Sequence, residues 1–175
     1  VFGLNAGPFQ EFKDSAEGIP LRLFVRESLA AKLPGKEWTK DWFETTKKGI
    51  DFFGVQFGYP FPYPKLDQVL LPEFGGGMEN VGAITYTENL AYRGQVTAQM
   101  RRGLRSMILH EIAHMWFGDL VTMRWWNSLW LNESFATYAS SLALSEAMGD
   151  KAAWQEFFAS AKQHAFWEDQ LVTTH

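Results

Sequence analysis

The sequence predicts an α+β fold in which a β-rich front half packs against a helical back half. Before about residue 90, short apolar and aromatic runs alternate with turns that contain glycine or proline, a pattern typical of strands and loops. After about residue 95, long segments without proline repeat apolar residues at helical spacing. No internal repeat or linker divides the chain, so we expect residues 1–175 to form one domain.

The front half is expected to hold four strands and one helix. The helix starts after Thr39 as its N-cap, runs to about Phe53 and ends near Gly54 or Gly58. A proline-rich, irregular stretch follows at 59–64, and a glycine-rich loop joins the last two strands. The expected strands are residues 2–4, 21–25, 68–71 and 83–86.

The back half is expected to hold three helices. The first runs from 96 to 117, with Gly118 as its C-terminal cap, and the second from 127 or 128 to 147. The third starts at Asp150 and ends near residue 166, and residues 171–175 are left unassigned. Small residues recur every three or four positions along the second helix and would let it pack closely against the first. They are Ala136, Ala139, Ser140, Ala143 and Ala147.

The first of these helices carries His110 and His114, with Glu111 between them. This spacing separates the two imidazoles by about 40° of rotation and about 6 Å of rise, so both can turn toward one metal ion. Glu111 points to one side, where it can take a proton from a water on that ion without becoming a ligand. The alternative is that both histidines are core residues. Burying two imidazoles and a carboxylate is costly unless a cation pairs with them, which favours the metal site.

Glu133 is the candidate third ligand, and eighteen residues separate it from His114. Two nitrogens, one carboxylate oxygen and a water suit the tetrahedral preference of zinc, so one Zn²⁺ ion is the expected cofactor. The alternative for Glu133 alone is a solvated charge near a helix N-terminus. Its neighbours Trp130, Leu131 and Phe135 favour a buried setting instead.

A third candidate element is the run Gly75-Gly76-Gly77-Met78-Glu79-Asn80. Consecutive glycines let a ligand approach bare backbone N–H and C=O groups, as when an extended peptide binds at a sheet edge. A carboxylate beside such an edge, that of Glu79, is suited to binding a free peptide N-terminus. The alternative is an ordinary glycine-rich turn with a surface glutamate.

Three blocks of this sequence resemble the signature of the gluzincin zinc aminopeptidases of the aminopeptidase N type, a group that includes the bifunctional leukotriene hydrolases. The blocks are Gly76 to Asn80, His110 to His114, and Trp130-Leu131-Asn132-Glu133, and both their order and their spacing fit. The resemblance covers nearly the whole chain from about Trp38 onward. It implies a thermolysin-like zinc peptidase catalytic domain, with the metal site on the helical half.

The resemblance also implies a role for each residue of the three blocks. His110, His114 and Glu133 would be the zinc ligands, and Glu111 would be the general base and later the proton donor to the leaving amine. Glu79 would bind the α-ammonium group of a peptide substrate and so limit cleavage to one N-terminal residue. The remaining residues would lie along the substrate backbone or shape its turn: Gly76, Gly77, Met78 and Asn80.

One departure from the family pattern concerns a tyrosine that stabilises the oxyanion from a helix well downstream of the glutamate ligand. Only Tyr138 follows Glu133 here, five positions on, which is too early for that role. With a start at Val1 rather than methionine, this predicts a truncated chain that would contact N- and C-terminal domains of a longer protein. Eight tryptophans and fifteen phenylalanines fit such lost interfaces.

The composition argues against several other classes of protein. Sixteen basic and twenty acidic residues give a net charge of −4, which offers no support for nucleic-acid binding. No run of eighteen apolar residues is present, so no membrane span is expected in this segment. The absence of cysteine excludes disulfides but does not fix the compartment. No serine lies in a G-x-S-x-G elbow, so covalent catalysis has no evident nucleophile.

Two classes of function therefore stay open. The first is a zinc aminopeptidase that acts on peptides with a free N-terminus, with an epoxide-hydrolysing relative as a variant of the same site. The second is a non-catalytic module, either a zinc-stabilised fold or an incomplete fragment that keeps the site without turnover. The preferred N-terminal residue cannot be read from the sequence.

Overall fold

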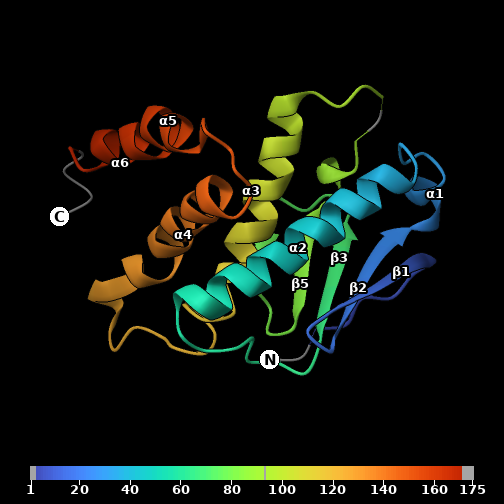
Figure 1. The fold of residues 1–175 in the computed structure, drawn as a ribbon, viewed down its shortest axis with the longest axis horizontal. Coiled ribbons are helices and arrows are strands. Elements are labelled where there is room, and N and C mark those ends of the chain that lie inside the picture. The colour runs from blue at the N-terminus through green and yellow to red at the C-terminus, as the bar shows by residue number, and fades with distance from the viewer. Residues whose placement is uncertain (1–2, 93, 171–175) are drawn as a thin grey trace.

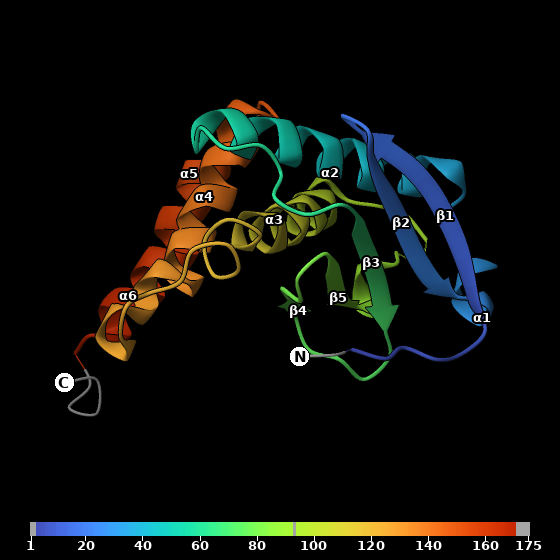
Figure 2. The same cartoon turned by 90° about the horizontal axis from the view of Figure 1, so that it is seen from below.

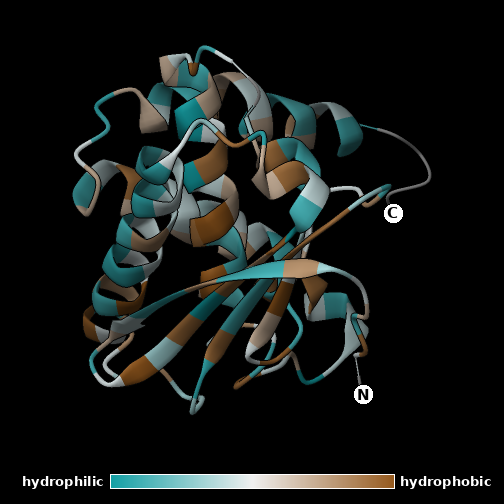
Figure 3. Ribbon diagram, turned by 90° about the vertical axis from the view of Figure 1, so that its right-hand side faces the viewer, coloured by the Kyte–Doolittle hydropathy of each residue, from teal (hydrophilic) through white to brown (hydrophobic). Residues whose placement is uncertain are grey.

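The structure, a computed structural model, describes residues 3–92 and 94–170 as a mixed sheet with helices packed on it (Figure 1). Five strands form the sheet in the order β1-β2-β3-β5-β4. The predicted α+β class is therefore confirmed. Apolar and polar residues alternate along the strands, brown and teal in Figure 3, because one face of the sheet meets the helices.

The sheet is antiparallel at its two edges and parallel in the middle. β1 (Phe9–Ala16) and β2 (Ile19–Arg26) form a hairpin, and β2 runs parallel to β3 (Leu66–Leu71). β3 is parallel to β5 (Ala83–Thr87), which pairs antiparallel with the edge strand β4 (Gly77–Met78). The central strand β3 is the most deeply buried, since only its last residue is partly exposed.

The predicted strands at 21–25, 68–71 and 83–86 are confirmed as β2, β3 and β5. The strand predicted at 2–4 is wrong for residues 3 and 4, which belong to no strand, and Phe2 lies outside the described residues. The first strand is β1, in which the apolar residues Phe9, Phe12 and Ala16 are too widely spaced to form an alternating pattern. It ends at a two-residue turn, Glu17-Gly18, with positive φ at both positions, as a type I′ hairpin requires.

Two long helices, α2 (Lys36–Gln56) and α3 (Ala98–His114), lie on one face of the sheet (Figure 2). α2 begins three residues before the predicted Thr39, whose hydroxyl donates to the Lys36 carbonyl inside the helix. Of the two predicted ends, Gly54 is wrong, because it lies inside α2, whereas Gly58 follows the helix with a φ of 66°. α3 ends at His114, three residues before the predicted end.

The second ligand-bearing helix, α4 (Glu133–Glu146), packs against α3 as predicted. Its small residues form the buried face, with Ala136, Ala139 and Ala143 at most 1% exposed. The predicted start at 127 or 128 is wrong. A 3-10 segment, η2 (Trp126–Leu131), occupies that stretch, and non-helical angles at Asn132 separate it from α4.

Shorter elements complete the described chain. The third predicted helix is present as a nearly continuous run with a π-helical middle, and Asp150 accepts a hydrogen bond from the Ala152 N–H before its start. Residues 171–175 lie outside the described residues. Among the described helices, none combines the length and the apolar character needed to cross a membrane. The elements not yet named are α1 (Glu27–Ala30), η1 (Glu88–Leu90), α5 (Ala153–Phe157), η3 (Phe158–Lys162) and α6 (Gln163–Glu168).

A buried network of hydrogen bonds connects α2 to the sheet through Gln68 of β3. The Trp42 Nε1–H and the Tyr86 hydroxyl both donate to Gln68 Oε1, at 3.0 and 3.3 Å. Gln68 Nε2 in turn donates to the Thr46 hydroxyl at 3.2 Å. Gln68 is fully buried, so each of these groups depends on the others for its hydrogen bonds.

Substituting Gln68→Leu is therefore expected to lower the free energy of unfolding by about 1–3 kcal/mol, because buried Trp42 and Tyr86 donors lose their acceptor. Urea denaturation followed by tryptophan fluorescence measures the change. Gln10→Leu, at an exposed position of β1, is the matched control and should have little effect. If the two variants had equal urea denaturation midpoints, the role of the network would be contradicted.

Candidate functional site

The two histidines near the end of α3 and Glu133 at the start of α4 converge on one point. His110 Nε2 lies 3.1 Å from His114 Nε2 and 3.1 Å from Glu133 Oε2, and the His114 Nε2 to Glu133 Oε2 distance is 3.5 Å. Donors held 2.0–2.2 Å from a tetrahedral zinc ion lie about 3.3 Å apart. The donor types and their spacing therefore fit one zinc ion.

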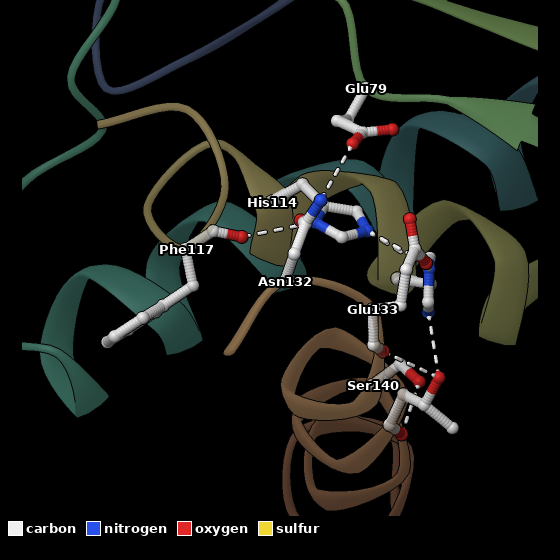
Figure 4. Close-up of polar contacts among 8 residues, drawn as sticks. Glu79, His114, Phe117, Asn132, Glu133 and Ser140 are labelled. Carbon is white, nitrogen blue, oxygen red and sulfur yellow. Dashed lines mark hydrogen bonds and ion pairs between the residues drawn. The ribbon is translucent and has the colours of Figure 1, made fainter. Parts of the chain in front are cut away.

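Hydrogen bonds on the far side of each imidazole orient both rings (Figure 4). His114 Nδ1 lies 3.1 Å from the Phe117 carbonyl oxygen, which can only accept, so this nitrogen carries the proton. His110 Nδ1 lies 3.5 Å from the Thr137 hydroxyl, whose own hydrogen goes to the Glu133 carbonyl at 2.9 Å. Each Nε2 is thereby left to face the common point as an acceptor.

Two imidazole nitrogens and a carboxylate oxygen this close together favour a cation among them. The hydrogen bond from His110, helped by the charge of His114, holds the pKa of Glu133 below its ordinary value. A divalent ion would satisfy all three groups at once.

Glu111 lies beside this cluster in a setting unlike that of Glu133. It is 3% exposed, and its Oε2 has no hydrogen-bond partner. Burial raises its pKa to about 7, against the opposing charge of His110 and with a further contribution from Glu79. A carboxyl group with a pKa near neutrality is suited to exchanging protons.

Donor atoms of Glu79, Glu111 and His114 also lie within 4.8 Å of one another, so a second ligand set is conceivable. It shares His114 with the first. We favour His110, His114 and Glu133, because the geometry of both rings is fixed toward that point and Glu111 is the group left without a partner.

The glycine-rich run lies against the same site. Gly77 and Met78 form β4, which pairs with β5 on one side and is the last strand of the sheet on the other. A Cβ atom on Gly77 would collide with the Glu111 carboxylate, so the absence of a side chain lets the strand approach that group. Gly76, at a φ of 77°, accepts from the Thr87 N–H at 2.8 Å.

The carboxylate of Glu79 is tied to the helical half through Asn132, whose Nδ2 donates to Glu79 Oε1 at 3.4 Å (Figure 4). Asn80 instead turns toward β5, where its Nδ2 donates to the Thr85 hydroxyl at 3.5 Å. The predicted ligands, base and ammonium-binding residue are thus close together, and Asn80 helps to hold the turn.

A cavity of about 460 Å³ opens at this site. Of the predicted residues, five line it: Gly77, Glu79, His110, Glu111 and Glu133. Gly76, Met78 and Asn80 do not, and His114 reaches the cluster from a fully buried position.

Three residues of the site were missed by sequence reasoning. Thr137 follows Glu133 by one helical turn, a spacing that could have identified it as a partner of the ligand set. Asn132 precedes Glu133 directly, but its bond to Glu79 depends on the tertiary fold. Asp119 offered no signal, although its Oδ2 is buried without a partner and burial raises its pKa to about 7.

Comparison with known proteins places the chain in a family. Residues 42–175 match the family described as "Peptidase family M1 domain". The chain belongs to peptidase family M1. This confirms the family resemblance that the three sequence blocks indicated.

Similar proteins come from bacteria, archaea and yeasts. The "Aminopeptidase N" of Streptomyces lividans is 42% identical over 182 residues, which cover 100% of this chain and 21% of that protein. "Probable aminopeptidase 2" of Sulfurisphaera tokodaii is 38% identical, covering 98% of this chain and 22% of its own length. The "Tricorn protease-interacting factor F2" of Thermoplasma acidophilum is 37% identical, and the match covers 98% of this chain and 21% of that protein. The chain spans about a fifth of the length of these relatives.

The buried, unpartnered carboxylate of Glu111 implies a cost in stability. In the metal-free protein at pH 8, where this side chain is largely ionised, Glu111→Gln is expected to raise the free energy of unfolding by about 1–3 kcal/mol. Thermal unfolding in the presence of a chelator measures this change. Glu133→Gln is the contrasting control and should not stabilise, because Glu133 is already paired with histidine. An equal or lower melting temperature for Glu111→Gln would contradict the argument.

Proposed function

We propose that this chain carries the metal-binding and catalytic residues of a zinc-dependent aminopeptidase, which hydrolyses the first peptide bond of substrates with a free N-terminus. The observation that carries the proposal is the convergence of three donor atoms within 3.1–3.5 Å beside an unpartnered carboxylate. Membership of peptidase family M1, and relatives named as aminopeptidases, support the same reaction class.

In this proposal His110, His114 and Glu133 hold one zinc ion. The fit rests on the donor set, the spacing of the donors, and the two outer hydrogen bonds from the Nδ1 atoms of the rings to the Phe117 carbonyl and the Thr137 hydroxyl. When bound, the ion would lower the pKa of a water molecule and polarise the carbonyl of the substrate.

Glu111 acts as the general base and afterwards as the proton donor to the leaving amine. Its carboxylate lines the cavity next to the ligand set but has no hydrogen bond of its own, so it is free to accept a proton from water. No serine or cysteine nucleophile is required, because water attacks the peptide carbonyl directly.

Glu79 binds the α-ammonium group of the substrate. Its bond to Asn132 holds one carboxylate oxygen in place, and the group faces the same cavity as Glu111. The open edge of β4, at Gly77 and Met78, would pair with the first residues of an extended peptide, while Gly76 and Asn80 keep the loop in shape. The Glu79 carboxylate at this end of the cavity would prevent a longer peptide from extending past it.

We further propose that residues 1–175 form part of a thermolysin-like catalytic domain that contacts other parts of a longer protein. A specific observation keeps the non-catalytic alternative open. Among the described residues no tyrosine lines the cavity, and Tyr138 packs against Phe135 and Trp154 instead. The oxyanion-stabilising hydroxyl expected in this family therefore has no candidate within the described residues.

Glu111→Gln is expected to lower the turnover of an aminoacyl anilide by about 10²–10⁴-fold while the protein retains its zinc, because only the proton acceptor is lost. Anilide hydrolysis and metal content by atomic absorption are the two measurements. His114→Ala is the complementary control, which should lose both zinc and activity, as should treatment with a chelator. Zinc at one equivalent in a protein that hydrolyses nothing would favour the non-catalytic alternative.

Glu79→Ala is expected to reduce the preference for free over acetylated N-termini by about 10–100-fold, since a charged hydrogen bond to the ammonium group is lost. Rates on a paired set of free and N-acetylated peptides give this ratio. Glu79→Gln keeps the shape and the contact with Asn132 but not the charge, and should lose most of the preference too. An unaltered ratio in both variants would remove the proposed role.

A further inference from the structure

The cavity continues well beyond the ligand cluster. From His110 its wall follows α3 back through Met107 and Ser106 to Arg102, and from Glu133 it follows α4 forward to Leu144. Moving away from the cluster lowers the residue number on α3 and raises it on α4, so the two helices run antiparallel along the cavity. The segment formed by α5 and η3 closes the third side (Figure 1).

The length of this groove corresponds to a few residues of peptide. Eight residues of helix, from His110 to Arg102, span about 12 Å. An extended chain advances about 3.3 Å per residue. A peptide whose first carbonyl lies at the ligand cluster would therefore bring its fourth or fifth residue to the Arg102 end.

Several hydrogen-bond acceptors line the groove. The hydroxyls of Ser140 and Ser141 donate to the Thr137 carbonyl, at 2.9 and 3.1 Å, and that of Ser160 donates to the Glu156 carbonyl at 2.6 Å. With their hydrogens engaged, these hydroxyls have lone pairs left to accept. Glu111 adds a carboxylate to the lining at the other end. Such a lining suits a ligand that brings N–H groups and positive charge.

The far end of the groove has an excess of negative charge. Arg102 is held by Asp150 through two hydrogen bonds, at 2.5 and 3.2 Å, and reaches Glu156 by one, at 3.0 Å. Two carboxylates thus surround one guanidinium group. Glu156 is the more exposed of them, with 47% of its side chain accessible, and it lines the groove, whereas Asp150 does not.

We infer that this groove holds the part of a peptide substrate that follows the cleaved bond, and that Glu156 favours a basic side chain at the fourth or fifth position. The inference rests on the proposed aminopeptidase function and adds a class of substrate to it. A free C-terminal carboxylate at Arg102 is the less favourable occupant, because that guanidinium is already paired with two carboxylates.

The test uses binding, so that turnover is not needed. Zinc-loaded Glu111→Gln protein is titrated with alanine pentapeptides that have a free N-terminus and an amidated C-terminus. A single Lys, Gln or Glu is placed in turn at positions two to five. Lys at position four or five is expected to bind about two- to five-fold more tightly than Gln, and Glu more weakly by a similar factor.

Adding Glu156→Gln to this protein is expected to bring the Lys-to-Gln ratio at those positions close to one. Asp150 still holds Arg102, so the surrounding structure is retained, and thermal unfolding checks this. Glu146→Gln, on the exposed surface of α4 and outside the groove, is the matched control and should keep the ratio.

The outcomes separate the two proposals. If peptides bind, and the parent protein cleaves them, but Lys, Gln and Glu are equivalent at every position, the inference about Glu156 is overturned and the proposed function stands. The same holds if the preference survives Glu156→Gln. If no peptide binds and the zinc-loaded parent cleaves none, the proposed function itself is overturned.

Discussion

The close contact between α3 and α4 is the constraint on which the site depends. A glutamate side chain reaches only a few ångströms, so Glu133 can meet His110 and His114 only if the two helix backbones approach closely. The buried face of α4 permits this approach because Ala136, Ala139 and Ala143 present no bulk to α3. A larger side chain at any of them would move the carboxylate away from the imidazoles.

The same contact leaves one charged group in an unfavourable place. Glu111 occupies the next position on α3 and is enclosed by the helices on one side and the glycine strand β4 on the other. Its carboxylate gains no hydrogen bond at Oε2 from this enclosure. Both histidines thus have a hydrogen-bond partner at Nδ1, whereas Glu111 Oε2 has none. A buried carboxylate without a partner lowers stability, and such groups are frequent at reactive sites.

Local spacing explains what the sequence could predict. Some features are encoded within a few neighbouring residues: the two histidines four positions apart, the small-residue face of α4 and buried strands such as β3. The helices, most of the sheet and the converging cluster were therefore predictable. β1 was missed because its apolar residues do not alternate with polar ones. The predicted start of α4 was too early because nothing in the local sequence marks the non-helical angles at Asn132. The contacts from Asn132 to Glu79 and from Thr137 to His110 join different elements, which a linear pattern does not encode.

The ligand cluster lies where a sheet edge and a helical groove meet, and this position gives the cavity a direction. On one side β4 offers backbone groups and Glu79 offers a negative charge, which together suit the charged end of an extended chain. On the other side α3 and α4 continue as walls lined with acceptors for about 12 Å. A peptide bound with its first residue against Glu79 can extend only along the helices. Under the proposed function, the geometry that would restrict attack to the first peptide bond would also bring the following residues against side chains remote from the ligand cluster. Selectivity could then change there without disturbing the groups proposed for catalysis.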